Sequence, residues 1–176
     1  MAIYVPKETG VAALMEVHKV PWDELEHAYG TGVGKAAHEN VPASLQLLGG
    51  TDDESLDEAV HLLFGNICHQ GTIYESTAYA FPFIAAWGAG AEPSEETENA
   101  VVQLLACIGI AATFDAPHGS HAGSWGPAVS AATKSAIAAS QKHLDVIATR
   151  SPKLKRLVSA LVPTVNAAEL NALLEE

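Results

Sequence analysis

The sequence predicts an all-α protein, and three observations lead to this fold class. Helix-capping residues recur along the chain, apolar residues repeat at three- and four-residue spacing, and the alternation typical of half-buried strands is nearly absent. The chain has 176 residues, of which 48% are hydrophobic and 17% charged, enough for one domain with its own core. We therefore expect a single domain over residues 1–176 with eight or nine helices.

Prolines mark the first two predicted helices. A proline suits the first turn of a helix, where its missing N–H costs nothing, and this predicts helices over 21–29 and 42–48. Gly30, Gly32 and Gly34 follow the first of them. A glycine-rich phosphate cradle would need a preceding strand, so we interpret these glycines as a connecting loop.

Two capping boxes mark the next two helices. Residues 51–54 (Thr-Asp-Asp-Glu) and 72–75 (Thr-Ile-Tyr-Glu) each place a threonine three residues before a glutamate. They predict helices over 53–68 and 73–87, capped by their threonines. Pro82 lies within the second pattern and predicts either a kink or a first-turn position.

The second half of the chain continues the helical pattern. Ser94 caps a helix whose residues 100–112 are apolar nearly all round, and we expect this helix at the centre of the protein. A glycine-rich loop over 115–126 precedes an alanine-rich helix that is predicted over 126–149. Two shorter helices complete the chain, each behind a capping residue: Ser151 and Asn166.

The helix starts also suggest repeats. The capped starts at Thr51 and Ser94 are 43 residues apart, within the period of about 40–47 residues of HEAT and armadillo repeats. Each two-helix unit leaves an apolar face that only a neighbouring unit can cover. We expect an α-α superhelix of HEAT-like antiparallel helix pairs. A compact irregular bundle would give a similar pattern and is the alternative.

The charge is distributed unevenly. The formal net charge is -12, and residues 36–133 contain twelve acidic residues and no Lys or Arg. Such a segment repels a phosphate backbone, which argues against nucleic-acid binding, and it would steer a basic protein into contact. A merely solvated surface is the simpler interpretation. The acids that we expect to meet a basic partner are Asp52, Asp53, Asp57, Glu58, Glu92, Glu95 and Glu96.

Four short segments form an ordered series of motifs: 22–30, 41–42, 65–74 and 80–84. The third ends in His-Gln-Gly-Thr-Ile-Tyr, and the fourth contains Phe-Pro-Phe. The series resembles a group of bacterial HEAT-repeat-like proteins that carry a similar turn followed by Pro-Phe. The resemblance covers about a third of the chain. It implies a superhelical fold and a protein-binding scaffold without a catalytic centre, of the kind suspected as immunity or accessory proteins in interbacterial toxin systems.

The turn within the third segment has its own physical interpretation. His69 and Gln70 are expected to end one helix, Gly71 to take the left-handed C-terminal cap, and Thr72 to cap the next helix. A structural hinge is the first interpretation, and recognition of a partner by His69, Gln70 and Tyr74 is the second. Tyr74 and Trp125 are also the aromatic residues that we consider as anchors for a partner.

One loop could hold a metal ion. Asp115, His118 and His121 supply a carboxylate and two imidazoles within seven residues. A glycine-rich loop does not fix their geometry, so we expect no metal and no cofactor. A metal-assisted hydrolase centred on these three residues is the alternative function.

The cysteines and the targeting patterns indicate in which cellular compartment the protein resides. Cys68 and Cys107 lie in apolar runs and form no disulfide framework. We find neither a signal-peptide pattern nor about 18 consecutive apolar residues, so we expect a cytoplasmic protein without membrane contact. Together, the resemblance to the HEAT-repeat-like proteins and the acidic segment imply a non-enzymatic scaffold, most specifically an immunity-type protein that binds and occludes a basic toxin.

Overall fold

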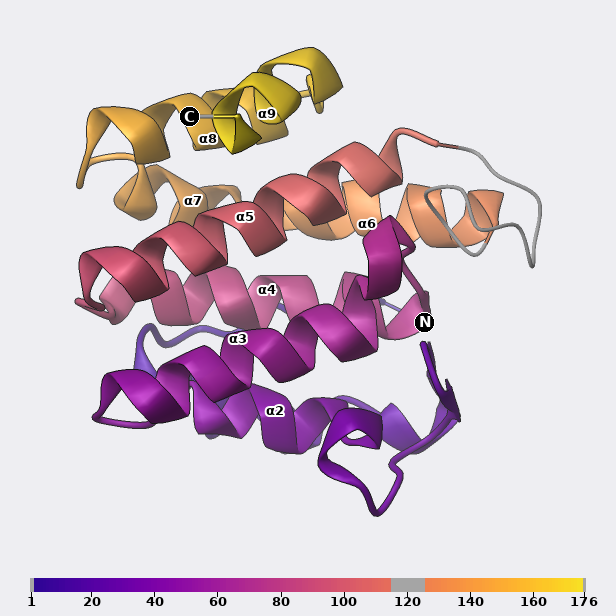
Figure 1. Ribbon diagram of the computed structural model, residues 1–176. Helices are drawn as coiled ribbons and strands as arrows, with labels where there is room; N and C mark the ends of the chain where they lie inside the picture. The colour runs from indigo at the N-terminus through magenta and orange to yellow at the C-terminus, as the bar shows by residue number, and fades with distance from the viewer. Residues whose placement is uncertain (1, 115–125, 176) are drawn as a thin grey trace.

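Nine α-helices make up most of the regular structure in a computed structural model that describes residues 2–114 and 126–175 (Figure 1). Strand structure in this part of the chain is limited to one two-stranded ladder. The predicted all-α class is therefore confirmed. The helices are α1 (Val11–Leu14), α2 (Val41–Leu47), α3 (Asp53–Ile67), α4 (Glu75–Gly90), α5 (Glu95–Ala112), α6 (Pro127–Ala139), α7 (Gln141–Ile147), α8 (Pro152–Leu161) and α9 (Ala167–Leu174).

Most predicted caps are present, and one lies a residue further along. The cap of α3 is Asp52 rather than Thr51, because Asp52 Oδ1 accepts a hydrogen bond from Ser55 N at 2.9 Å and Asp52 Oδ2 another from Ser55 Oγ at 2.9 Å. A carboxylate is at least as good a cap as a hydroxyl, and its charge also suits the helix dipole. The caps at the starts of α5, α8 and α9 are as predicted: Ser94, Ser151 and Asn166.

The start of α4 differs more from the prediction. Thr72 is extended and buried but does not cap the helix, which begins after Tyr74. Thr77 closes this end instead, because its Oγ1 accepts a hydrogen bond from Tyr74 N at 2.8 Å. Pro82 lies in the interior of α4, so the first-turn alternative for this proline is wrong.

The predicted helix over 21–29 is wrong. Trp22–Glu24 forms one 3-10 turn, and strands β1 (Glu26–His27) and β2 (Gly30–Thr31) then pair antiparallel. Gly30 has φ 137° and Gly32 has φ 94°, values that side-chain-bearing residues rarely adopt. These glycines allow the chain to reverse where a helix would have continued.

The predicted helix over 126–149 is divided in two. Ser140 ends α6 with φ -84° and ψ 4°, and α7 starts at the next residue. Ser140 Oγ donates a hydrogen bond to the Ala136 carbonyl oxygen at 2.8 Å, the back-bonding that often bends helices.

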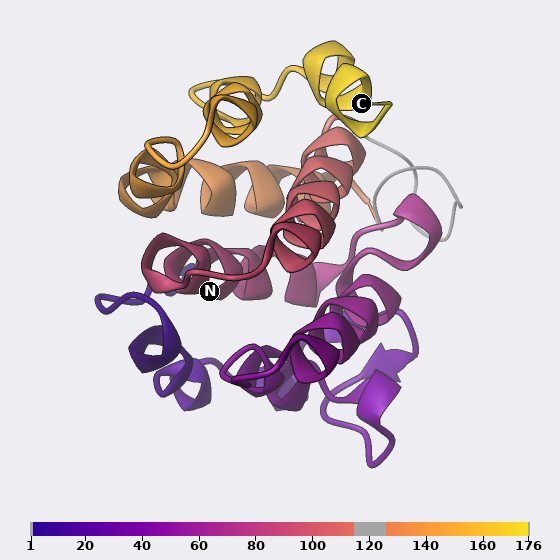
Figure 2. The same cartoon turned by 60° about the vertical axis from the view of Figure 1, so that its left-hand side comes forward.

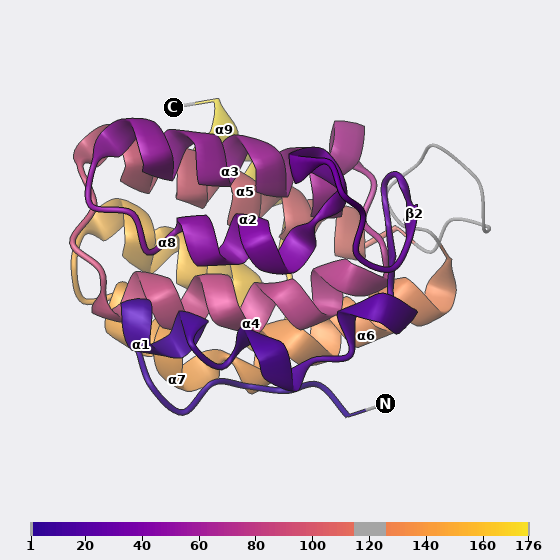
Figure 3. The ribbon, with the colours of Figure 1, turned by 90° about the horizontal axis from the view of Figure 1, so that it is seen from below.

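Alternate helices pack against one another. α5 lies along α3 and runs in the same direction, whereas α4 packs on α6 and α7 (Figures 1 and 3). α2 covers α3 at one end of the stack, and α8 and α9 cover α5 at the other (Figure 2). Stacked helix pairs produce this alternation. The HEAT-like superhelix itself stays a prediction.

The core centres on α4 rather than on α5. Every residue from 76 to 88 is buried, including Phe81, Phe83 and Trp87, whereas α5 exposes Gln103. The small residues of α4 allow neighbours to approach on all sides, so this helix takes the central position that the sequence predicted for α5. No helix in residues 2–114 and 126–175 is long and apolar enough to cross a membrane.

Candidate functional site

The acidic residues predicted to meet a partner gather at one end of the molecule. α3 and α5 begin at the same end, on the left of Figure 1, so the acids of their first turns face solvent together. We call the following seven exposed residues the acidic end: Asp52, Asp53, Asp57, Glu58, Glu92, Glu95 and Glu96.

Nearby cations do not neutralise the acidic end. Arg150 pairs with Glu98 at 3.0 Å, and Lys153 Nζ donates to Asn99 Oδ1 at 3.0 Å. None of the seven acids forms an ion pair with a described residue. Asp52 also caps α3. The hydrogen bonds that it accepts from the backbone N–H and the hydroxyl of Ser55 lower the pKa of its carboxyl. The acidic end therefore presents concentrated negative charge to solvent.

A second polar cluster lies at the opposite end of α3. Tyr29, 46% exposed, has its ring centroid 4.8 Å from that of His38, 5.6 Å from that of His69 and 6.4 Å from that of His27. We call these four residues the Tyr29 cluster. The sequence pattern indicated His69 but not Tyr29, because segments distant in the sequence meet here.

The turn after α3 supplies His69 to this cluster. α3 ends at Ile67, and His69–Gly71 forms a 3-10 turn in which Gln70 has φ 49° and Gly71 has φ 77°. The left-handed Gly71 is as predicted. The left-handed Gln70 was not, since such backbone is uncommon for a residue with a side chain. Gln70 is exposed and His69 half-buried.

Tyr74 lies inside the protein rather than on its surface. It is 7% exposed, and burial raises the pKa of its hydroxyl. Its place at the start of α4 gives it a structural role in the turn. Within this region Tyr29 is the tyrosine that a partner could reach.

The segments that carry the resemblance pack together. Ala28 N donates to the Asn66 carbonyl oxygen at 3.0 Å, and Glu26 N donates to Glu75 Oε2 at 3.1 Å. The ring centroids of Trp22 and Phe83 are 6.4 Å apart. The hairpin, the turn and α4 thus form one structural unit.

His27 is the buried member of the Tyr29 cluster. It is 4% exposed, and burial lowers the pKa of its imidazole despite the nearby Gly32 backbone and two glutamates. Its Nδ1 accepts a hydrogen bond from Tyr29 N at 3.3 Å. A neutral imidazole satisfies this contact, because only an unprotonated ring nitrogen can accept.

The two cysteines and the His, Asp and Glu side chains bear on catalysis by a thiolate or by a metal ion. Burial raises the pKa of Cys68 and of Cys107, which disfavours a thiolate nucleophile at either position. In 2–114 and 126–175, no three His, Cys, Asp or Glu side chains lie close enough to hold a metal ion. The predicted metal residues and one predicted anchor lie outside the described residues: Asp115, His118, His121 and Trp125.

Comparisons with known proteins add no further assignment. No protein-family model matches the chain, and searches of curated proteins and of solved structures find no significant match.

Proposed function

We propose that this protein is a non-enzymatic scaffold that binds a basic protein through its acidic end. The observation that carries the proposal is the parallel start of α3 and α5, which collects seven exposed acids that form no ion pair with a described residue. Negative potential concentrated on one surface accelerates encounter with a positively charged partner. An immunity-type protein that occludes a basic toxin fits this chemistry. The resemblance of segments 22–30 and 65–74 to bacterial HEAT-repeat-like proteins agrees with this proposal.

The acidic surface continues along α3. Asp53, Asp57 and Glu58 lie on its solvent-facing side, and His61 continues that side toward the Tyr29 cluster. A helix of this length spans about 22 Å, which fits within a protein–protein interface of ordinary size. A partner lying along α3 would be steered by the acids and would meet Tyr29 as an aromatic contact.

The test is capture of a partner from lysate of the native organism at low salt, followed by a salt gradient. The informative variant combines Asp53→Asn, Asp57→Asn, Glu95→Gln and Glu96→Gln, and it spares Asp52, which caps α3. We expect the wild-type protein to retain a basic protein that this variant releases at lower salt.

A matched control has the same net charge. It combines four exposed acids outside the acidic end: Glu8→Gln, Asp23→Asn, Asp145→Asn and Glu175→Gln. We expect this control to retain the partner as the wild-type protein does. Equal loss in both variants would reduce the effect to net charge, and retention that is independent of salt would overturn the electrostatic mechanism. Co-expression with the captured protein then tests whether binding suppresses its toxicity.

A further inference from the structure

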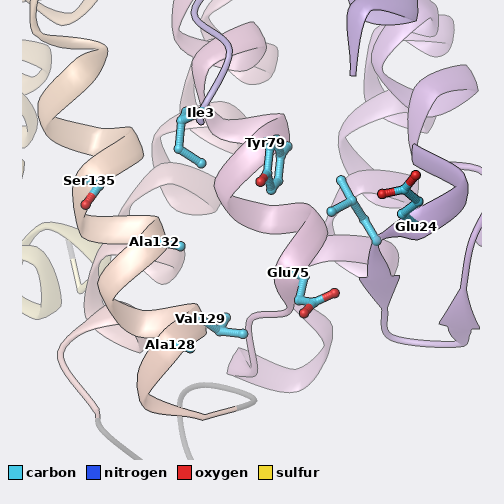
Figure 4. A pocket seen from close by; sticks show the side chains of 9 residues that line it. Ile3, Glu24, Glu75, Tyr79, Ala128, Val129, Ala132 and Ser135 are labelled. Carbon is cyan, nitrogen blue, oxygen red and sulfur yellow. The ribbon is translucent and has the colours of Figure 1, made fainter. Parts of the chain in front are cut away.

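A groove of about 590 Å³ opens between α4, α6 and the segment before β1 (Figure 4). Its volume is within the range of about 300–1,000 Å³ that is usual for ligand sites. Four separate parts of the chain line it: the N-terminal segment, the segment before β1, α4 and α6. The lining residues are Ile3, Glu24, Leu25, Glu75, Tyr79, Ala128, Val129, Ala132 and Ser135.

The wall that α6 contributes to the groove consists of small, mostly apolar residues. Ala128, Ala132 and Ser135 are small residues that follow one another along the helix at four- and three-residue spacing. Val129 completes this wall, and Ile3 lies at its edge (Figure 4). This wall suits an aliphatic chain.

The opposite wall carries the charge. Glu24 and Glu75 are the charged residues that line the groove, and both are acidic and exposed. Neither forms an ion pair with a Lys or Arg in the described part of the chain. The Glu75 carboxylate is held in place because it accepts a hydrogen bond from Glu26 N at 3.1 Å.

Tyr79 lies one turn after Glu75 on α4 and contributes an aromatic ring to the same wall (Figure 4). It is 8% exposed, and burial together with the Glu75 charge raises the pKa of its hydroxyl. Its ring therefore stays neutral at physiological pH. A neutral aromatic ring beside carboxylates attracts a cation.

We propose that this groove binds an arginine side chain, flanked by apolar residues, of the basic protein partner. The inference rests on the proposed function, since it names the group by which such a partner is recognised. A guanidinium can contact Glu24 or Glu75 with two parallel hydrogen bonds and stack on an aromatic face. Its aliphatic stem lies on Ala128 and Ala132, and the charge of the groove excludes anionic ligands.

The experiment titrates acetyl-Ala-Leu-Arg-Leu-Ala-amide into the ¹⁵N-labelled protein and follows the amide shifts. The matched peptide contains citrulline, which keeps the shape of arginine without its charge. We expect the arginine peptide to shift the amides of Glu75, Tyr79 and Ala132, and the citrulline peptide to bind about tenfold more weakly. Equal binding of the two peptides, or shifts confined to other surfaces, would overturn the inference.

Two variants act on the groove by different means. Glu24→Gln with Glu75→Gln removes its charge, and Ala132→Phe fills it. We expect each variant to bind the arginine peptide about tenfold more weakly or worse. The control combines Asp23→Asn with Asp145→Asn, at two exposed acids outside the groove, and should leave this affinity unchanged. Circular dichroism checks that Ala132→Phe is folded. If it is not, the charge variant decides, and unchanged affinity in that variant contradicts the inference.

The two proposals fail in distinguishable ways. If a basic partner is captured equally by the wild-type protein and by both groove variants, the groove inference is wrong and the proposed function stands. If neutralising the acidic end also leaves capture unchanged, the proposed function is wrong. If the arginine peptide still binds in that case, the groove is a binding site that does not serve recognition of a basic protein partner.

Discussion

At the scale of single residues, Glu16 joins the N-terminal segment to the helical body. It is 8% exposed, and its carboxylate accepts hydrogen bonds from the Tyr4 hydroxyl, from Lys19 Nζ at 2.7 Å and from the backbone N–H groups of Lys7 and Glu8. Lys19 and Tyr4 lower the pKa of this carboxyl to about 2. Four donors therefore converge on this one buried carboxylate.

Replacing this carboxylate should therefore weaken the fold. We expect Glu16→Gln to lower the free energy of unfolding by about 1–3 kcal/mol at neutral pH, because charge-assisted hydrogen bonds are lost in a buried place. Urea denaturation measures this difference, with the exposed Glu8→Gln as control. Since folding lowers the pKa of Glu16, its stabilisation is present above the unfolded value of 4.5 and is lost as the pH falls from 4.5 to about 2. A variant as stable as the wild-type protein would contradict this role.

His27 gives a second dependence on pH, in a higher range. Folding lowers the pKa of this imidazole, so the unfolded chain binds the proton more readily, and stability falls as the pH drops below the unfolded value of 6.5. The variant His27→Asn retains an acceptor for Tyr29 N. We expect its free energy of unfolding to change less with pH than that of the wild-type protein, between about pH 6.5 and the lowered pKa of His27 in the folded protein. The exposed His61→Asn should keep the wild-type slope. An unchanged slope in His27→Asn would show that another group titrates.

At the scale of elements, sequence reasoning succeeded where local chemistry decides. The caps Ser94, Ser151 and Asn166 act on backbone N–H groups within three residues, so the starts of α5, α8 and α9 could be predicted. The hairpin could not, because its position depends on contacts such as Glu26 N with Glu75, far along the chain. The break at Ser140 was missed because alanine-rich flanks favour a continuous helix.

The same distinction applies to the candidate site. The acidic end was predictable because first-turn acids follow caps in the sequence, and only the parallel course of α3 and α5 had to be added. The Tyr29 cluster and the groove combine side chains from three or more segments. Periodicity within a single segment contains no information on such contacts.

Close packing of α5 against the last two helices gives an element-scale prediction. A Cβ atom at Gly109 would lie 2.6 Å from Leu161 Cδ2 and 2.7 Å from Leu170 Cδ1. We expect Gly109→Val to lower the free energy of unfolding by about 1–3 kcal/mol, because overpacking displaces α8 and α9. Thermal and urea denaturation measure the loss.

The control for this glycine lies on α3. A Cβ at Gly65 would meet only the Tyr29 hydroxyl, at 3.8 Å, which is ordinary contact. We expect Gly65→Ala to raise the free energy of unfolding by about 0.5–1 kcal/mol through helix propensity alone. If both substitutions shifted stability in the same direction, packing at Gly109 would not be the cause.

At the scale of the whole molecule, charge is segregated along the stack of helices. The acidic end belongs to α3, α5 and the residues just before them, whereas six of the nine basic residues follow residue 133. Part of that basic charge is already engaged, since Arg150 pairs with Glu98 and Arg156 with Glu169 at 2.8 Å. The outward field should therefore be negative and should originate mainly from one end.

This field predicts where a generic cation binds first. We expect a short oligolysine peptide, titrated into the ¹⁵N-labelled protein at about 0.01 M salt, to shift amides at the starts of α3 and α5 before those of α8 and α9. At about 0.15 M salt the Debye length falls from about 30 Å to about 8 Å, so these shifts should weaken strongly. The variant with Asp53, Asp57, Glu95 and Glu96 neutralised should lose them at low salt, whereas the equally charged control should keep them. Shifts spread evenly over the surface in all three proteins would mean that net charge, rather than the meeting of two helix starts, governs how this protein attracts cations.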